Sequence, residues 1–136
     1  MGNGINIDQL TKAVTSEMNK FRDLTHTALM EAVDKTTKET VKQIRANVRS
    51  NFGGTGEYAK SWTSDIVKLN RSSQYARKVY SRDPHYRLTH LLENGHAKVS
   101  GGRVIGTVKG RAHITPAEAN AQKMLVDEIK AGIAGR

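Results

Sequence analysis

The stretch IDQLTKAVTSEMNKFRDLTHTALMEAVDKTTKETVKQIRANVRSNF, residues 7–52, decides the fold of this chain. Its apolar and small residues recur at steps of three and four, the spacing that places side chains on one face of an α-helix. We therefore predict one long helix over residues 1–52, weakest and expected to bend in the threonine-rich stretch from Thr36 to Thr40. The turn-forming residues GGTG at 53–56 end it. The stripe consists of Ile7, Leu10, Val14, Met18, Phe21, Leu24, Ala28, Ala32, Val33, Val41, Ile44 and Val48.

The predicted helix is too long for its own domain to bury. About forty helical residues extend about 60 Å, which exceeds the diameter of a 15 kDa globule. Part of the stripe must then project or be covered by another chain, and we expect Leu10, Val14 and Phe21 to lie in a subunit interface. A coiled-coil dimer is disfavoured, because Ala, Thr and Met replace the regular Leu and Ile that such a seam needs.

The apolar pattern changes to a period of two in the middle of the chain. Residues 62–69 and 74–81 alternate and are rich in aromatic and β-branched side chains, with turn-forming residues at 70–73 between them. This predicts an antiparallel hairpin over residues 57–82. Asp83 and Pro84 then start a short helix over residues 84–95, which Asn94 and Gly95 end.

The next segment, residues 97–111, is rich in glycine. Val99, Val104 and Ile105 alternate there with four glycines, which predicts either a second hairpin or a mobile loop. We expect these three apolar side chains to lie in a subunit interface, because such an arm is readily ordered by a neighbouring chain.

The C-terminal helix has the clearest start signal. Thr115, Pro116 and Glu118 form the pattern of a capping box, with Thr115 as N-cap and Pro116 in the first helical position. An apolar stripe then predicts a helix over residues 115–134. The sequence therefore predicts a single α+β domain, residues 1–136, whose two long helices pack on one face of a small antiparallel sheet.

Charge is concentrated in the middle of the chain. The protein has no cysteine and a net charge of +9, so disulfides and cysteine-based zinc sites are excluded. Residues 58–113 contain eleven Lys or Arg and three acidic residues, a net charge of +8. Such a segment attracts polyanions in a salt-sensitive way, and we expect it to be a solvated face, to meet an acidic protein surface or to contact nucleic acid. The expected contacts are Lys60, Lys68, Arg71, Arg77, Lys78, Arg103, Lys109 and Arg111.

No motif in the sequence supports an enzyme. His85, His90 and Glu93 lie within nine residues, but His85 and His90 do not share a helix face, and a HExxH motif is absent. No serine lies in a GxSxG motif, and the glycines at 53–56 lack the strand and the lysine of a phosphate-binding loop. We therefore expect no catalytic residue, no metal site and no cofactor.

The sequence also indicates whether the chain spans a membrane and in which compartment it is made. No run of about 18 apolar residues is long enough to span a membrane. The first ten residues, MGNGINIDQL, lack the pattern of a signal peptide. We therefore expect no membrane partner and synthesis in a cytoplasm.

Three motifs follow one another in an order that resembles a known family. The motifs are Thr55-Gly56 with Ser61 and Trp62, then YRLTHLLENGHA at residues 86–97, and finally GGRV at 101–104 with RAHITPAE at 111–118. Together they resemble the neck or tail-completion proteins of long-tailed bacteriophages, related to the minor tail protein Z of lambda. The resemblance extends over nearly the whole chain.

This resemblance implies a structural function. Its proteins assemble as homo-oligomeric rings, six-fold or twelve-fold, in the virion at the head–tail junction, and the host cytoplasm would be the place of synthesis. The partners would be head-completion and tail proteins, with packaged DNA as a further contact. A tail terminator that caps the tail tube, and a basic nucleic-acid-binding protein, remain alternative functions.

Glu93 and Gly95 have structural roles that follow from their positions. Gly95 allows the short helix to end in a left-handed turn. A carboxylate in the last turn of a helix is unfavourable for the helix dipole, so Glu93 is expected to have a partner, either Arg103, Arg111 or His113. That contact would hold the glycine-rich arm against the short helix and position the C-terminal helix behind it.

Overall fold

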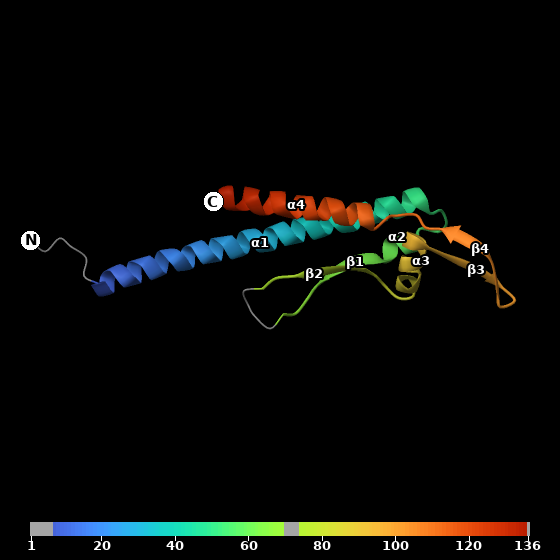
Figure 1. The fold of residues 1–136 in the computed structure, drawn as a ribbon. Coiled ribbons are helices and arrows are strands. Elements are labelled where there is room, and N and C mark those ends of the chain that lie inside the picture. The colour runs from blue at the N-terminus through green and yellow to red at the C-terminus, as the bar shows by residue number, and fades with distance from the viewer. Residues whose placement is uncertain (1–6, 70–73, 136) are drawn as a thin grey trace, which may run out of the picture.

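The computed structural model describes residues 7–69 and 74–135 and has the predicted α+β fold (Figure 1). The predicted turn at 70–73, which includes Arg71, lies outside the described residues. In chain order the elements are α1 (Ile7–Asn51), α2 (Glu57–Ser61), β1 (Trp62–Ile66), β2 (Arg77–Ser81), η1 (His85–Leu88), α3 (Thr89–Asn94), β3 (Gly95–Ser100), β4 (Arg103–Lys109) and α4 (Thr115–Ala134).

α1 is one continuous helix of 45 residues, about 67 Å long. The threonine-rich stretch does not interrupt it. Thr36 and Thr37 are buried there, and the hydroxyl of Thr40 donates to the carbonyl oxygen of Thr36 at 2.7 Å. Packing against the rest of the fold thus overrides the low helix propensity of threonine.

α1 forms the middle layer of three. α4 runs antiparallel along one side of it, as the contacts of Glu128 with Lys35 at 3.0 Å and of Asn120 with Gln43 at 3.3 Å show. The β1–β2 hairpin lies along the other side (Figure 1). We expected both long helices to pack on one sheet, but α4 packs mainly on α1, which separates it from the hairpin.

The strands form two separate antiparallel hairpins. β1 pairs with β2 from Trp62 opposite Ser81 to Ile66 opposite Arg77. The hydroxyls of Ser61 and Ser81 lie 2.7 Å apart at the base of this hairpin, where both are buried. β3 pairs with β4 in a second sheet, so residues 97–111 form the hairpin that was one of the two predicted alternatives.

The short helix α2 was missed within the predicted hairpin region. It begins after Gly56, which has a left-handed φ of 83°, and the backbone N–H of Glu57 donates to the hydroxyl of Thr55 at 3.4 Å. α2 buries Ala59 and Ser61 against α1 and leads directly into β1. The glycine-rich loop at 53–56 therefore joins two helices, which agrees with its interpretation as a helix stop.

The hydrophobic core lies at the C-terminal half of α1. Ile44 and Val48 of α1 pack there with Ala59, Trp62 and Ala117, which come from α2, β1 and α4. The core is small, and it leaves the N-terminal half of α1 without a covering layer. The remaining members, partly buried, are Phe52, Tyr58, Val79 and Ile114.

Stability should depend on the core half of α1 and not on its projecting half. We expect Ile44→Ala to lower the free energy of unfolding by about 2–5 kcal/mol, because Ile44 is 2% exposed and its loss leaves a cavity. Leu10→Ala, at a side chain 53% exposed, should change it by less than about 0.5 kcal/mol. Urea denaturation followed by circular dichroism measures both, and a similar loss for Leu10→Ala would contradict the assignment of the core.

Candidate assembly surfaces and the junction between them

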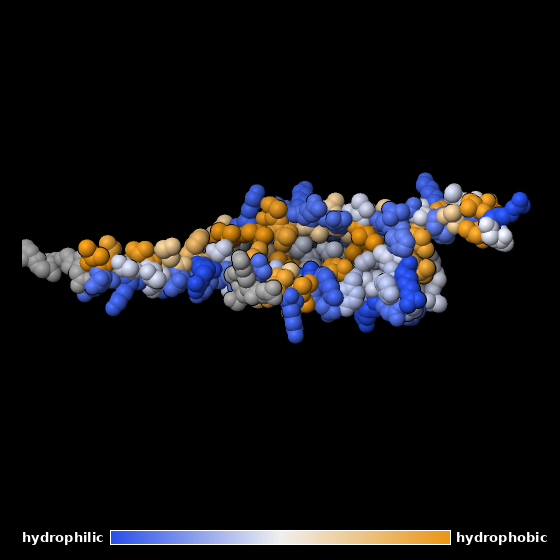
Figure 2. Space-filling view, turned by 60° about the horizontal axis from the view of Figure 1, so that its bottom comes forward, coloured by the Kyte–Doolittle hydropathy of each residue, from blue (hydrophilic) through white to orange (hydrophobic). Residues whose placement is uncertain are grey.

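The N-terminal half of α1, residues 7–27, projects beyond the rest of the fold as a bare helix (Figure 1). The stripe residues Ala28, Ala32, Ile44 and Val48 are buried under neighbouring elements. Toward the N-terminus the same stripe continues uncovered and forms a row of apolar side chains along the projecting helix (Figure 2). Its six members are 45–82% exposed: Ile7, Leu10, Val14, Met18, Phe21 and Leu24.

The apolar stripe of α1 becomes exposed near the C-terminal end of α4. Gly132 lies so close to α1 that a Cβ there would be 3.2 Å from the Cβ of Ala28. The next residue, Ile133, lines a small hollow of about 70 Å³ with Phe21 and Leu24. The exposed stripe is therefore a direct continuation of the surface that α4 covers.

The β3–β4 hairpin projects at the opposite end of the molecule (Figure 1). Val99 pairs with Val104, so their side chains lie on one face, and they are 62% and 69% exposed. A register shift next to Lys98 accommodates Ile105, which is 66% exposed. The three apolar residues predicted for an interface are thus on the surface of this hairpin.

The basic residues predicted to contact a polyanion do not form one patch. Arg77 forms an ion pair with Asp34 of α1 at 2.6 Å, and hydrogen bonding from Tyr75, together with Arg77, holds the pKa of Asp34 below its usual value. Arg111 donates to the carbonyl oxygen of Asn51 at the end of α1. These two arginines therefore hold elements together.

The other predicted basic residues lie on separate elements. Lys60 lies 3.9 Å from Glu57 on α2, and Lys78 stacks 4.9 Å from the ring centroid of Tyr80. Lys68 is exposed beyond the end of β1. Arg103 and Lys109 are exposed on β4, at its beginning and its end.

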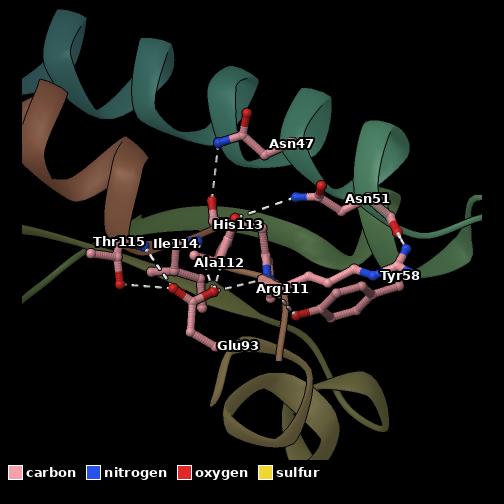
Figure 3. Close-up of polar contacts among 9 residues, drawn as sticks. All are labelled: Asn47, Asn51, Tyr58, Glu93, Arg111, Ala112, His113, Ile114 and Thr115. Carbon is pink, nitrogen blue, oxygen red and sulfur yellow. Dashed lines mark hydrogen bonds and ion pairs between the residues drawn. The ribbon is translucent and has the colours of Figure 1, made fainter. Parts of the chain in front are cut away.

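A junction centred on Glu93 connects the two ends of the molecule (Figure 3). One carboxylate oxygen of Glu93 accepts hydrogen bonds from the backbone N–H groups of His113 at 2.7 Å and Ile114 at 3.0 Å. The other accepts from the backbone N–H of Thr115 at 2.9 Å and from its hydroxyl at 2.8 Å. The carboxylate of α3 therefore caps the start of α4, where the helix dipole favours a negative charge.

This arrangement corrects one of the predictions made for this part of the chain. The hydroxyl of Thr115 donates to Glu93, and α4 has no capping bond from a side chain of its own, so the predicted capping box is wrong. Pro116 does lie in the first turn of α4, as predicted. Of the three partners proposed for Glu93, His113 is found, through its backbone and its ring, whereas Arg111 binds the end of α1.

The hydrogen bonds change the acidity of Glu93. Burial alone would raise its pKa, but the bonds from His113, Ile114 and Thr115 outweigh burial and lower the pKa from 4.5 to about 2. Glu93 is therefore ionised throughout the physiological range. Its negative charge faces the positive end of the α4 dipole.

His113 fills the space behind the carboxylate. Its side chain is fully buried, and Nδ1 lies 2.9 Å from both Glu93 and the carbonyl oxygen of Arg111. Nε2 lies 2.8 Å from the hydroxyl of Tyr58, whose pKa is raised by burial. Because both neighbours of Nδ1 are acceptors, a neutral His113 ring carries its hydrogen on Nδ1, and Nε2 then accepts from the Tyr58 hydroxyl. Three aromatic rings surround the imidazole, and their planes make angles of 72–86° with the imidazole plane: Phe52, Tyr58 and Trp62.

The base of the β3–β4 hairpin is fixed by direct backbone contact. Gly95 has a φ of 88°, and a Cβ on it would lie 2.5 Å from the carbonyl oxygen of Val108. A Cβ on Gly110 would lie 2.4 Å from the carbonyl carbon of Asn94. Only glycine fits at both positions, so the hairpin starts and ends against the last residue of α3.

A metal site requires a particular geometry of the side chains that hold the ion. Among residues 7–69 and 74–135, no three His, Asp or Glu side chains come together as a metal site would require. Glu93, the potential metal ligand next to His90, is fully engaged by α4. No helix in the described part of the chain is long and apolar enough to cross a membrane.

The fold and its surfaces are those of an elongated protein with an apolar surface exposed at each end. A rigid central junction holds two projecting elements, and both carry exposed apolar side chains. The chain belongs to the HK97-gp10-like family, whose description is "Bacteriophage HK97-gp10, putative tail-component" and whose match covers residues 12–95. It is therefore a structural phage tail component of the virion, and the match confirms the family resemblance of its motifs. No curated protein and no solved structure matches the chain.

The family match includes Glu93 and Gly95 but ends before most of the β3–β4 hairpin and before α4. The sequence identified Glu93 and His113 as contact residues, but it did not identify Tyr58 as the partner of His113. It also did not identify Asn47, which donates to the carbonyl oxygen of His113 at 3.1 Å. Neither had a local signal, because 55 and 66 residues separate the partners along the chain.

Glu93 should make stability depend on pH. Because its folded pKa of about 2 lies below the unfolded value of 4.5, its contribution is present above pH 4.5 and is lost as the pH falls toward 2. We expect Glu93→Gln to lower the free energy of unfolding at pH 7 by about 3 kcal/mol and to flatten the acid dependence. Glu118→Gln, in the same first turn of α4, is the matched control. Equal pH profiles for the wild type and Glu93→Gln would refute this role.

Gly110, the residue after β4, should tolerate no side chain, in contrast to Gly106 within β4. Gly110→Ala forces a Cβ to within 2.4 Å of the backbone, so we expect a loss of about 1–3 kcal/mol or more. Gly106→Ala meets no atom within 4 Å and should change stability by less than about 0.5 kcal/mol. Thermal unfolding of both variants measures the difference. An unaffected Gly110→Ala protein would show that the hairpin base is not fixed by this contact.

Proposed function

We propose that this tail component is a neck or tail-completion protein, which assembles into a ring at the head–tail junction and allows a filled head to join the tail. The bare half of α1 supports this proposal most strongly. Six large apolar side chains there are 45–82% exposed in the monomer. Burying each by contact with another chain is favourable by about 1.5–3 kcal/mol before association costs are subtracted.

The positions of the two projecting elements favour a ring. The exposed stripe of α1 and the β3–β4 hairpin lie at opposite ends of the molecule and differ in structure (Figure 1). A chain whose two contact surfaces differ associates head to tail, and such contacts close into rings when the rotation allows. A self-complementary dimer would instead use the same surface on both copies.

A contact with polyanions is a second role that the hairpin favours. Residues 95–111 contain four Lys or Arg and no acidic residue. Lys98 and Arg103 lie on the opposite face of the hairpin from the Val99–Val104 pair, because side chains alternate along a strand. The hairpin could thus contact another subunit with one face and DNA in the ring lumen with the other. A tail terminator shares these surfaces, and the assembly stage at which the protein is required distinguishes it.

A double substitution within the stripe should block assembly without unfolding the chain. We expect Val14→Asp/Phe21→Asp to keep its helix content, because both side chains are exposed, and to stay monomeric where the wild type forms rings. In a phage that lacks the wild-type gene, this variant should leave full heads beside unattached tails. Light scattering and negative-stain microscopy provide the two measurements.

The matched control is Thr15→Asp/Asn19→Asp, two exposed polar positions of the same helix that are not part of the stripe. This variant should assemble as the wild type does. Normal virions from the stripe variant would overturn the proposal. Retardation of a DNA duplex at low salt, lost in Lys98→Glu/Lys109→Glu, would instead favour the nucleic-acid role.

A further inference from the structure

A groove of about 710 Å³ runs along the core half of α1, between the β1–β2 hairpin and α4. It is separate from the projecting half of α1 and from the β3–β4 hairpin. Lys35, Lys38, Lys42 and Arg45 line it, at steps of three, four and three residues along α1. That spacing places four cations in one row on one helix face, about 15 Å long.

Part of this charge is neutralised within the protein. Lys35 lies 3.0 Å from Glu128 of α4, and Arg77, on the hairpin side, pairs with Asp34 at 2.6 Å. The row still carries excess positive charge, because the groove is lined by five Lys or Arg and by only two acids, Asp34 and Glu39.

Three cations remain available to a ligand. Lys38 and Lys42 are exposed. Arg45 donates to the carbonyl oxygen of Trp62 at 2.6 Å, which fixes its guanidinium but leaves its charge uncompensated, since a carbonyl is neutral. The side chain of Arg45 is thus held in place at one end of the row.

The rest of the lining suits a peptide. Thr63 and Ser64 of β1 supply polar groups on one wall, while Val41 of α1 and Met124 of α4 supply apolar surface. Because the row lies between two flanking elements, it is accessible to a single helix, about 10–12 Å across, or to an extended segment.

We propose that this groove is the docking site for an acidic segment of an adjoining virion protein. Acidic side chains at i and i+3 or i+4 of a partner helix would face the row, since both series repeat at about 5–6 Å. A second copy of this chain is a poor occupant, because its net charge of +9 repels the groove. The partner's identity as a virion protein rests on the proposed function, whereas the affinity for an acidic segment does not.

Fluorescence anisotropy with a labelled 18-residue helical peptide, carrying Glu at every fourth position, tests the proposal on the full-length protein. We expect saturable binding that weakens as salt increases. Lys38→Glu/Lys42→Glu should weaken it at least tenfold, whereas Lys12→Glu/Lys20→Glu, the same charge change on the projecting half of α1, should weaken it less than threefold. Glu39→Gln should strengthen it, because it removes a like charge from the groove.

Equal losses in the two charge-reversal variants would show general attraction and overturn the docking site. The absence of binding at low salt would also overturn it. Displacement of the peptide by a 20-base-pair duplex, with duplex binding that requires Lys38 and Lys42, would overturn it too and would make the groove a nucleic-acid site. Circular dichroism of each variant verifies that it is folded. Since peptide binding is measured on the isolated protein, its failure is distinct from a failure of head–tail joining.

Discussion

The contact between Glu93 and the start of α4 is the one on which the rest of the structure depends. α3 ends in a carboxylate that its own helix dipole disfavours, and α4 begins with amide groups that need acceptors. The start of α4 donates four hydrogen bonds to the Glu93 side chain. These bonds stabilise the carboxylate and give the amide groups the acceptors that they need. This contact fixes where α4 begins, and α4 in turn determines how much of α1 is covered.

The junction has consequences at both ends of the molecule. The 20 residues of α4 reach back along α1 to Ala28, and Ile133 at its end lies beside Phe21 and Leu24, so the stripe from Met18 back to Ile7 is left exposed. On the other side, the close contact of Gly95 and Gly110 directs the β3–β4 hairpin away from the core. A small core thus holds two projecting elements in a fixed relation, an arrangement suited to a protein that is one unit of a larger assembly.

The sequence predicted the elements well because their signals are local. Helical spacing in α1, alternation in the two hairpins and the proline at the start of α4 each depend on a few neighbouring residues. The need of Glu93 for a partner was also predictable, from its position at a helix end. The identity of that partner was not, because most of the donors are backbone N–H groups, which every residue but proline carries.

Tertiary packing explains the other differences. Thr115 and Glu118 have the spacing of a capping box, but a carboxylate from another helix takes the place of that local solution. The basic row on α1 was not predicted, because its four cations are separated along the sequence and come together only on one face of the long helix. Similarly, Arg77 and Arg111 were assigned to a polyanion surface although they bind Asp34 and the end of α1.

The glycine contact at the base of the hairpin has a mechanical consequence. Where backbone touches backbone, no flexible side chain is available to absorb movement. A load applied to the tip of the β3–β4 hairpin is therefore transmitted to the end of α3, and through the Glu93 carboxylate to α4 and the long rod beside it. The base of the hairpin is thus the point at which such a load meets the least compliant contact.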